Sequence, residues 1–243
     1  KTVKEIIKIK MSKQQNFAYK KALGILDKSD LKNMQSGKKQ ITNVSKFNAF
    51  LNKSRRISNL ATDINSPKLL TILKKCKTGP KPIIIYSNWL SSGIEPMVEL
   101  LNKAKISNLS FTGSKTDTQK KAIVEAYNRK EIDVLLLSSS GSEGLDLKNT
   151  RQIHIMEPHW NIAKINQVIG RGIRYKSHNS LPKKERLVNV FYWVSLPDLP
   201  KGKKGADEYL YELSDEKIKL MEDFLKVLVK NSVETKICRV KQS

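Results

Sequence analysis

IDVLLLSSSGSEGLDLKNTRQIHIMEP, residues 132–158, holds the pattern that decides the fold. A short apolar run at residues 134–137 precedes a loop rich in serine and glycine, and RQIHIMEP follows at residues 151–158. Runs of this length are too short for a buried helix, and a nearly continuous apolar character is typical of strands buried on both faces of a parallel sheet. The stretch therefore predicts two strands joined by a loop of small residues.

The same rhythm continues on both sides of this stretch. Three further strands are predicted, PIIIYS at residues 82–87, NLSFTG at 108–113 and VNVFYWVS at 188–195. Helical patterns lie between the strands at residues 95–104, 116–129 and 161–175. Strands that alternate with helices of this length predict an α/β fold with a parallel sheet covered by helices on both faces.

Three domains or segments are expected along the chain. Residues 1–66 are predicted to be a basic helical segment, residues 67–196 the α/β lobe, and residues 197–243 a loop with a helical extension. A helix is expected to start at Ser66-Pro67, because serine is a common cap and proline suits the first turn. The apolar face of the last helix is expected to pack on the domain; it consists of Leu210, Leu213, Ile218, Met221, Leu225 and Leu228.

The charge of the chain is strongly basic and uneven. Of the formal net charge of +23, residues 1–81 contribute 20 basic and 4 acidic side chains, a net of +16. A basic surface of this kind indicates a polyanionic partner, most commonly nucleic acid. The alternative is a lysine-rich composition that only keeps the protein soluble.

Several other classes are disfavoured by composition. Cys76 and Cys238 stand far apart without neighbouring His or Cys clusters, which argues against a disulfide scaffold or a zinc site. No apolar run approaches the roughly 20 residues of a membrane helix. The chain starts without methionine, and we expect it to be a fragment of a longer protein.

The loop at residues 138–149 is the first candidate site. Its hydroxyl groups can donate to phosphate; they belong to Ser138, Ser139, Ser140 and Ser142. Gly141 and Gly144 would let backbone amides approach an anion, and Asp146 would suit a ribose hydroxyl or a metal-bound water. The alternative interpretation is a flexible Ser/Gly loop without a ligand.

INQVIGRGIRYKSH, residues 165–178, is the second candidate site. It contains no carboxylate, and on a helix Gln167, Arg171 and Arg174 would share one face. The rigid guanidinium fork grips phosphate oxygens, and such a pair can neutralise charge on a transferring γ-phosphoryl group. Otherwise the two arginines are surface residues paired with distant acids.

A phosphate-binding loop is missing. No GxxxxGK[ST] motif occurs anywhere in the chain, and neither PKGKKGADE nor ELSDEK has the required spacing and position. The chain therefore has arginines that could assist phosphoryl transfer, but nothing to hold a triphosphate and magnesium alone.

Residues 66–195 resemble the second RecA-like lobe of superfamily 2 helicases and translocases. PIIIYSNW resembles the strand of helicase motif IV, VLLLSSSGSEGLDL motif V, and QVIGRGIR motif VI with its QxxGRxxR pattern, while FTGSKTDTQKKAIVEAYN is similar to the block between motifs IV and V. MEPHWN, which precedes the motif VI stretch, is similar to the segment that SWI/SNF-type ATPases have at the same place. The run GRGIRYKSHNSLPKKERLVNVFYW resembles a group from large DNA viruses, which includes poxvirus nucleoside triphosphate phosphohydrolase I and the early transcription factor ATPase subunit.

This resemblance implies a RecA-like helicase C-terminal lobe in an ATP-driven motor on nucleic acid. ATP with Mg²⁺ would be held mainly by a first lobe that this chain lacks. Arg171 and Arg174 would be the arginine fingers, and the cleft would also be lined by Gln167, Gly144 and Asp146. The nucleic-acid backbone would face Ser138, Ser140, Thr112 and Gly113.

The implied partners are DNA or RNA, the missing N-terminal RecA-like lobe, and a viral RNA polymerase or transcription factor, with no membrane involved. The implied location is intracellular and, for a viral protein, the virion and the host cytoplasm or virus factory.

Other aromatic and basic residues are weaker candidates. Arg55 and Arg56 lie in a very basic helix and are candidates for phosphate contacts, against a solvated face as the alternative. The three tryptophans could stack on bases, although core packing is preferred for each; Trp160 is the foremost exception among Trp89, Trp160 and Trp193. His154 is expected in the core, whereas His159 and His178 are candidates to approach the cleft.

Two functions are therefore weighed. The leading one is the second motor lobe of a transcription-linked viral helicase or translocase, inactive as an ATPase without its partner lobe. The alternative is a non-enzymatic nucleic-acid-binding scaffold module of a transcription complex. A phosphate loop upstream of Lys1 in the parent gene would discriminate between them. A dinucleotide- or methyl-donor-binding enzyme is disfavoured because no GxGxxG follows a first strand.

Overall fold

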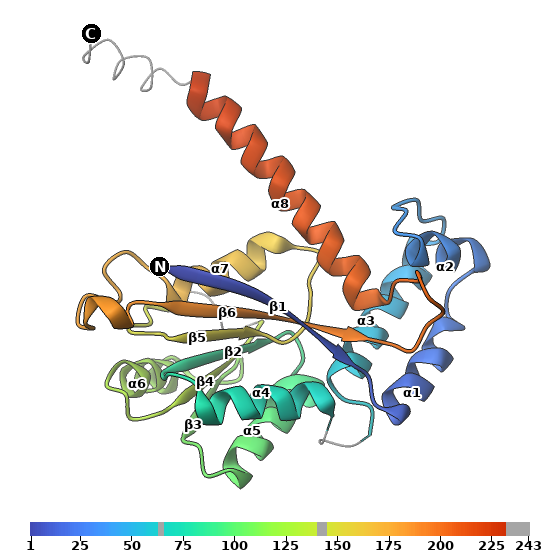
Figure 1. Ribbon diagram of the computed structural model, residues 1–243. Coiled ribbons are helices and arrows are strands. Elements are labelled where there is room, and N and C mark those ends of the chain that lie inside the picture. Colours follow the sequence, from blue (N-terminus) through green and yellow to red (C-terminus); the bar gives the residue numbers. More distant parts are fainter. Residues whose placement is uncertain (63–65, 140–144, 232–243) are drawn as a thin grey trace.

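The computed structural model describes residues 1–62, 66–139 and 145–231, and its centre is a sheet of six parallel strands (Figure 1). The strands lie in the order β1-β6-β5-β2-β4-β3. Their bounds are β1 Thr2–Lys10, β2 Ile83–Ser87, β3 Asn108–Phe111, β4 Val134–Ser138, β5 Gln152–Ile155 and β6 Val188–Leu196. All five predicted strands are confirmed, and so is the α/β class.

Strands β2 and β4 are neighbours in the interior of the sheet, and every residue of both is buried. They pair in register from Ile83 opposite Val134 to Ser87 opposite Ser138. This burial explains their unbroken apolar sequence, because a strand covered on both faces has no side on which a polar residue meets water.

Strand β1 was not predicted, and the helical interpretation of residues 1–66 is wrong for its first ten residues. β1 pairs with β6 along its whole length, from Thr2 opposite Val188 to Lys10 opposite Leu196. As an edge strand it is only half covered: Ile7 and Ile9 pack on the core while most of the strand is exposed. The alternation of isoleucine and lysine in IKIK, residues 7–10, was the available signal.

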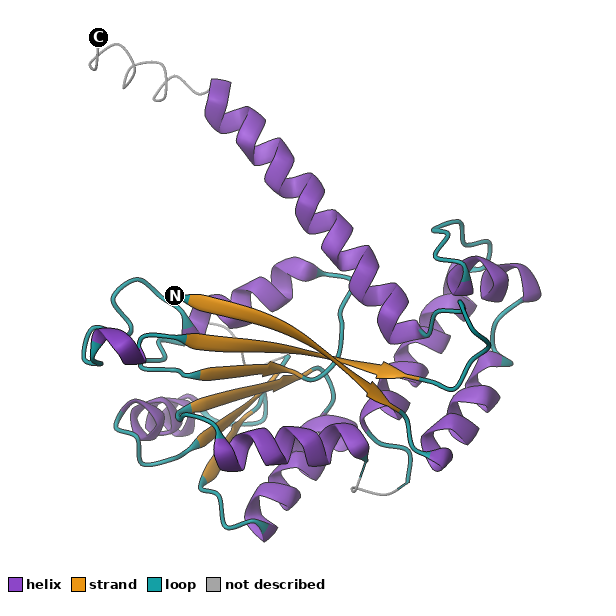
Figure 2. Ribbon diagram, in the orientation of Figure 1, coloured by secondary structure: helices purple, strands orange, loops and turns teal. Residues whose placement is uncertain are grey.

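Helices cover both faces of the sheet (Figure 2). On one face lie α6 (Asp117–Asn128) and α7 (Ile162–Gly172), and on the other lie α4 (Pro67–Thr78) and α5 (Glu95–Lys103), with α5 preceded by a π-helical turn, η1 (Leu90–Ile94). A short 3₁₀ turn, η2 (Lys183–Glu185), precedes β6. α4 begins as expected, because the Ser66 hydroxyl accepts a hydrogen bond from Leu69 N at 3.3 Å.

A separate helical unit lies beyond the carboxyl ends of β1 and β6 (Figure 1). It consists of α1 (Lys13–Leu23), α2 (Lys28–Gln35), α3 (Val44–Asn59) and the first turns of α8 (Ala206–Asn231). Its core includes the Tyr19–Phe50 and Phe47–Tyr209 edge-to-face pairs, with ring centroids 5.8 and 5.6 Å apart. The helical unit therefore has its own apolar core, and α8 joins it to the lobe.

Only the first half of α8 packs on the domain. Leu210 is fully buried, but Met221, Leu225 and Leu228 are each about half exposed, and the helix projects away from the sheet (Figure 2). The expectation of a packed apolar face is thus correct for Leu210 and for the partly buried Leu213 and Ile218, and wrong for these three residues. In the part of the chain that the structure describes, α8 included, no helix combines the length and apolarity needed to cross a membrane.

Candidate functional site

Helix α7 carries the first of the two predicted arginine fingers. Ile165 and Val168 bury one side of the helix against the sheet, while Gln167 faces solvent and Arg171 is half-buried. The Nε atom of Arg171 is buried and has no hydrogen-bond partner among the described residues. A buried donor without an acceptor is costly, so an incoming anion would stabilise it.

The second predicted finger does not lie on the helix. α7 ends at Gly172, and Arg174 follows in the next turn, so the expectation that the two arginines share one helical face is wrong. At Gly172, where the helix ends, the backbone lies close to the sheet: a β-carbon there would come within 2.9 Å of Ile84.

Arg174 nevertheless meets another predicted site residue. Its Nη1 lies 3.6 Å from Oδ1 of Asp146, and both side chains are about half exposed. An exposed ion pair of this kind contributes only ~0–1 kcal/mol, so the guanidinium can exchange its partner at little cost. Asp146 also lines an open hollow of about 470 Å³, together with Phe111 and Leu145.

The other predicted residues follow the carboxyl ends of β3 and β4. Thr112 is buried directly after β3, its hydroxyl 2.9 Å from that of Ser114, and Gly113 is exposed next to it. Ser138 is the buried last residue of β4. Gly144 and Ser140 lie outside the described residues. A hydrogen bond from Lys164 to the Ser139 hydroxyl ties α7 to the end of β4.

Arg55 and Arg56 have different surroundings at the end of α3. The Arg55 guanidinium is almost fully buried between two tryptophans, 5.2 Å from the Trp89 ring and 4.8 Å from the Trp160 ring. Burial lowers the pKa of Arg55. Arg56 is exposed and lies 4.3 Å from the Trp89 ring. In this conformation a phosphate could reach Arg56 but not Arg55.

Trp160 is the tryptophan that faces outward. It is 37% exposed and stacks on His159 with ring centroids 4.5 Å apart, whereas Trp193 is fully buried. Burial, together with the nearby cations of Arg55 and Lys164, lowers the pKa of His159 to about 4, so the imidazole is neutral at pH 7. Trp160 therefore contacts both His159 and the Arg55 guanidinium and keeps part of its surface exposed to solvent.

The remaining two histidines are structural. His154 is fully buried and its Nδ1 accepts a hydrogen bond from Trp193 Nε1 at 3.2 Å, as expected of a core residue. The ring of His178 lies 2.7 Å from Thr150 O and 2.8 Å from the Ser177 hydroxyl. His178 therefore ties the turn after α7 to the start of β5.

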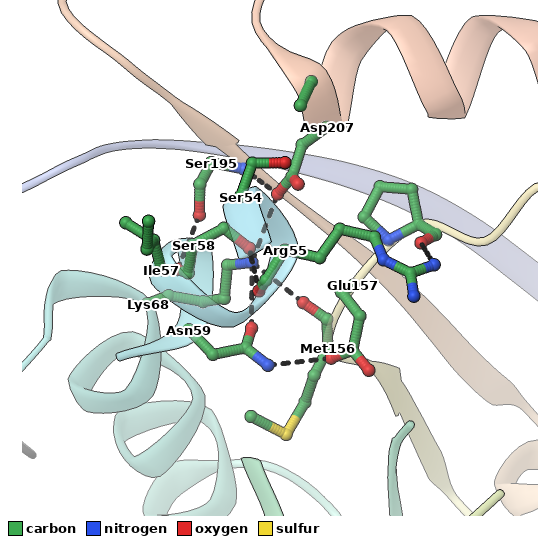
Figure 3. Close-up of polar contacts among 12 residues, drawn as sticks. Ser54, Arg55, Ile57, Ser58, Asn59, Lys68, Met156, Glu157, Ser195 and Asp207 are labelled. Atoms are coloured by element: carbon green, nitrogen blue, oxygen red, sulfur yellow. Dashed lines mark hydrogen bonds and ion pairs between the residues drawn. The ribbon is translucent and has the colours of Figure 1, made fainter. Parts of the chain in front are cut away.

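A buried polar network was missed by sequence reasoning. Lys68, Asn59, Glu157 and Asp207 are each 2% exposed or less and contact one another at the carboxyl edge of the sheet (Figure 3). The sequence offered little signal, since Lys68 is one of 46 lysines and arginines in a basic chain.

Comparisons with known proteins agree with this fold. The family described as "Helicase conserved C-terminal domain" matches residues 65–176. A protein of Acanthamoeba polyphaga mimivirus described as an ATP-dependent RNA helicase is 47% identical over 190 residues, which are 78% of this chain and 43% of that protein. A protein of African swine fever virus described as a termination factor NPH-I homolog is 28% identical over 234 residues, covering 71% of this chain and 33% of that protein.

Two solved structures share the fold along nearly the whole chain. The C-terminal part of the Fun30 ATPase domain has a TM-score of 0.62 at 13% identity, covering 93% of this chain and 97% of that one. The Sulfolobus solfataricus SWI2/SNF2 ATPase C-terminal domain has a TM-score of 0.56 at 12% identity, covering 96% and 89%.

Residues 65–176 therefore match the helicase conserved C-terminal domain family, and the fold along nearly the whole chain is that of SWI2/SNF2-type ATPase C-terminal domains. The two similar viral proteins come from large DNA viruses. The chain spans less than half the length of these two viral relatives.

Proposed function

We propose that this chain is the second motor lobe of an ATP-dependent nucleic-acid helicase or translocase. In this proposal a first RecA-like lobe, encoded elsewhere in the full-length protein, holds the triphosphate and Mg²⁺. The observation that carries the proposal is that the buried Nε of Arg171 has no acceptor among the described residues. Arg171 stands three residues before Arg174, whose exposed pairing with Asp146 can be exchanged. The absence of a phosphate loop from the sequence supports the need for a second lobe.

The arginines would act on the transferring phosphoryl group. ATP hydrolysis moves the γ-phosphoryl group to water, and negative charge spreads over its oxygens in the transition state. Arg171 and Arg174 would stabilise that charge, with Arg174 leaving Asp146 as the lobes close. Gln167, Asp146 and Gly144 would line the same cleft, and Asp146 could also accept from a ribose hydroxyl.

Nucleic acid would bind along the carboxyl edge of the sheet. Thr112, Gly113, Ser138 and Ser140 would meet the sugar-phosphate backbone, and Arg56 would contact a phosphate. Trp160 offers a partly exposed ring on which a base could stack, a contact worth ~1–3 kcal/mol. Arg55 would pack against Trp89 and Trp160 rather than contact phosphate, because its guanidinium is buried between the two rings.

The names of the relatives support a role in viral transcription. One is described as a termination factor homolog and another as an RNA helicase. We therefore place the motor in a viral transcription complex, with a viral RNA polymerase or transcription factor as partner, in the virion and the host cytoplasm or virus factory.

The test is ATP turnover by the full-length protein. We expect hydrolysis that DNA or RNA stimulates, and we expect R171A to lower kcat by ~10³-fold or more while leaving ATP affinity nearly unchanged. R129A is the matched control, because Arg129 is an exposed arginine at the end of α6 that pairs with Glu125. Wild-type turnover by R171A would refute the finger assignment, and nucleic-acid binding without any turnover would favour a scaffold instead.

A further inference from the structure

Lys68 is a lysine whose ammonium group is enclosed at the carboxyl edge of the sheet (Figure 3). Its Nζ lies 2.9 Å from Met156 O, 3.1 Å from Ser58 Oγ, 3.2 Å from Asn59 Oδ1 and 3.4 Å from Asp207 Oδ2. An ammonium group has three protons, so the three shorter contacts can use all of its donors, while Asp207 balances its charge.

Asn59 links Lys68 to the turn that follows a second strand, β2. Since its Oδ1 accepts from Lys68, its Nδ2 donates to Glu157 Oε2 at 2.9 Å. Glu157 in turn accepts from the backbone N of Asn88 at 2.5 Å and from the Ser87 hydroxyl at 3.1 Å. Lys68 therefore holds the end of β5 directly and the turn after β2 through two intermediates.

These two turns carry the two tryptophans that enclose Arg55. Trp89 follows Asn88 in the chain, and Trp160 stands four residues after Met156. Lys68 itself is 1% exposed and cannot touch a ligand. It can only determine where the turns, and hence the rings, stand.

The enclosed charges are balanced. Lys68 and Arg55 supply two positive charges and Asp207 and Glu157 two negative ones, and all four side chains are 2% exposed or less. Burial lowers the pKa of Lys68, and the charges of Asp207 and Glu157 oppose that shift. Removing one partner of such a set leaves a buried charge unpaired, which is far more disruptive than removing a pair.

We propose that Lys68 is a positioning residue for nucleic-acid binding. It holds Met156 directly, and it holds Asn88 through Asn59 and Glu157. It thereby sets the separation of Trp89 and Trp160 at the edge where a strand would be gripped. This inference rests on the proposed function.

The experiment measures binding of this 243-residue chain to fluorescein-labelled 20-nucleotide DNA and RNA strands by fluorescence anisotropy. N59L cuts the connection to Glu157 without removing a charge, and K68M/D207N removes an ion pair together. We expect each variant to raise Kd about tenfold, roughly the loss of one stacked base. The slope of log Kd against log salt should stay unchanged because Lys68 meets no phosphate, whereas R56A should reduce that slope by about one.

I72A is the control for a general loss of stability. Ile72 is fully buried on the same helix, α4, but in the core under the sheet. We expect I72A to lower Tm without changing Kd. The indole N–H signals of Trp89 and Trp160 should shift in the ¹H–¹⁵N spectrum of N59L. In the spectrum of I72A these two signals should keep their wild-type positions.

Three outcomes would count against the inference or its basis. Unchanged Kd and unchanged indole signals in N59L would overturn it. Indole shifts without a change in Kd would remove the nucleic-acid part. Failure of the wild-type chain to bind either strand would refute the nucleic-acid contact in the proposed function, and the indole signals alone would then decide whether Lys68 positions the rings.

Discussion

Gly170 and Gly172 lie two residues apart near the end of α7 and have opposite surroundings. A β-carbon at Gly172 would come within 2.9 Å of Ile84 Cδ1 and 3.0 Å of Ile153 Cδ1, both in the core. Among the described residues no atom lies within 4 Å of a β-carbon at Gly170. The first glycine is thus exposed on the helix, and the second allows the helix to approach the sheet.

The two glycines give a matched pair of stability predictions. G172A should lower the free energy of unfolding by ~1–3 kcal/mol, because the added methyl group overpacks the core. G170A should raise it by up to ~1 kcal/mol, because alanine favours a helix over glycine. Urea unfolding followed by circular dichroism measures both, and equal effects of the two substitutions would contradict the packing of α7.

His154 gives a pH prediction at the same scale. Burial, with the nearby charge of Lys75, lowers the pKa of His154 from its ordinary value of 6.5 to about 3 in the folded protein. As pH falls below 6.5, His154 binds a proton in the unfolded chain but stays neutral in the folded chain. Stability is therefore lost between about pH 6.5 and 3.

The expected slope for this one histidine approaches ~1.4 kcal/mol per pH unit below pH 6. Urea unfolding at pH 7, 6 and 5 measures it. H154Q can still accept a hydrogen bond from Trp193 but has no titrating ring, so its profile should be flatter than that of the wild type. Parallel profiles for the two proteins would show that His154 does not titrate across folding.

At the scale of elements, the strands buried on both faces gave the clearest sequence signal. β2 and β4 have uninterrupted apolar sequences because both of their faces are covered, and this pattern is local. The end of α7 was misplaced because a glycine packed against Ile84 depends on the fold rather than on helical periodicity. β1 was missed because its pairing with β6 joins residues far apart in the chain.

Helix α8 gives a prediction at this scale. Leu210 is fully buried in its first turns, whereas Leu228 is about half exposed in its projecting half. L210A should therefore cost ~2–5 kcal/mol of stability, and L228A less than ~1 kcal/mol. Thermal unfolding of the 243-residue chain measures both. A large loss for L228A would mean that the projecting half is covered in solution.

Over the whole molecule, the candidate site was predicted in its parts but not in its arrangement. The motif VI arginines and Asp146 were predicted from sequence, and the structure brings Arg174 and Asp146 together. The burial of Arg55 between two tryptophans and the network around Lys68 were not predicted. Each depends on α3, α4, β2 and β5 meeting in space, and no single stretch of sequence shows that meeting.

The place of β1 and β6 also bears on recombinant expression. The family match ends at residue 176, before β6, and starts at residue 65, long after β1. A protein fragment with those limits would lack two of the six strands, β1 and β6. The hydrogen-bonding edge of β5 would then be exposed beside the apolar core. Such a fragment should aggregate when expressed in bacteria, whereas a fragment that keeps the first ten residues and β6 keeps that edge of β5 paired.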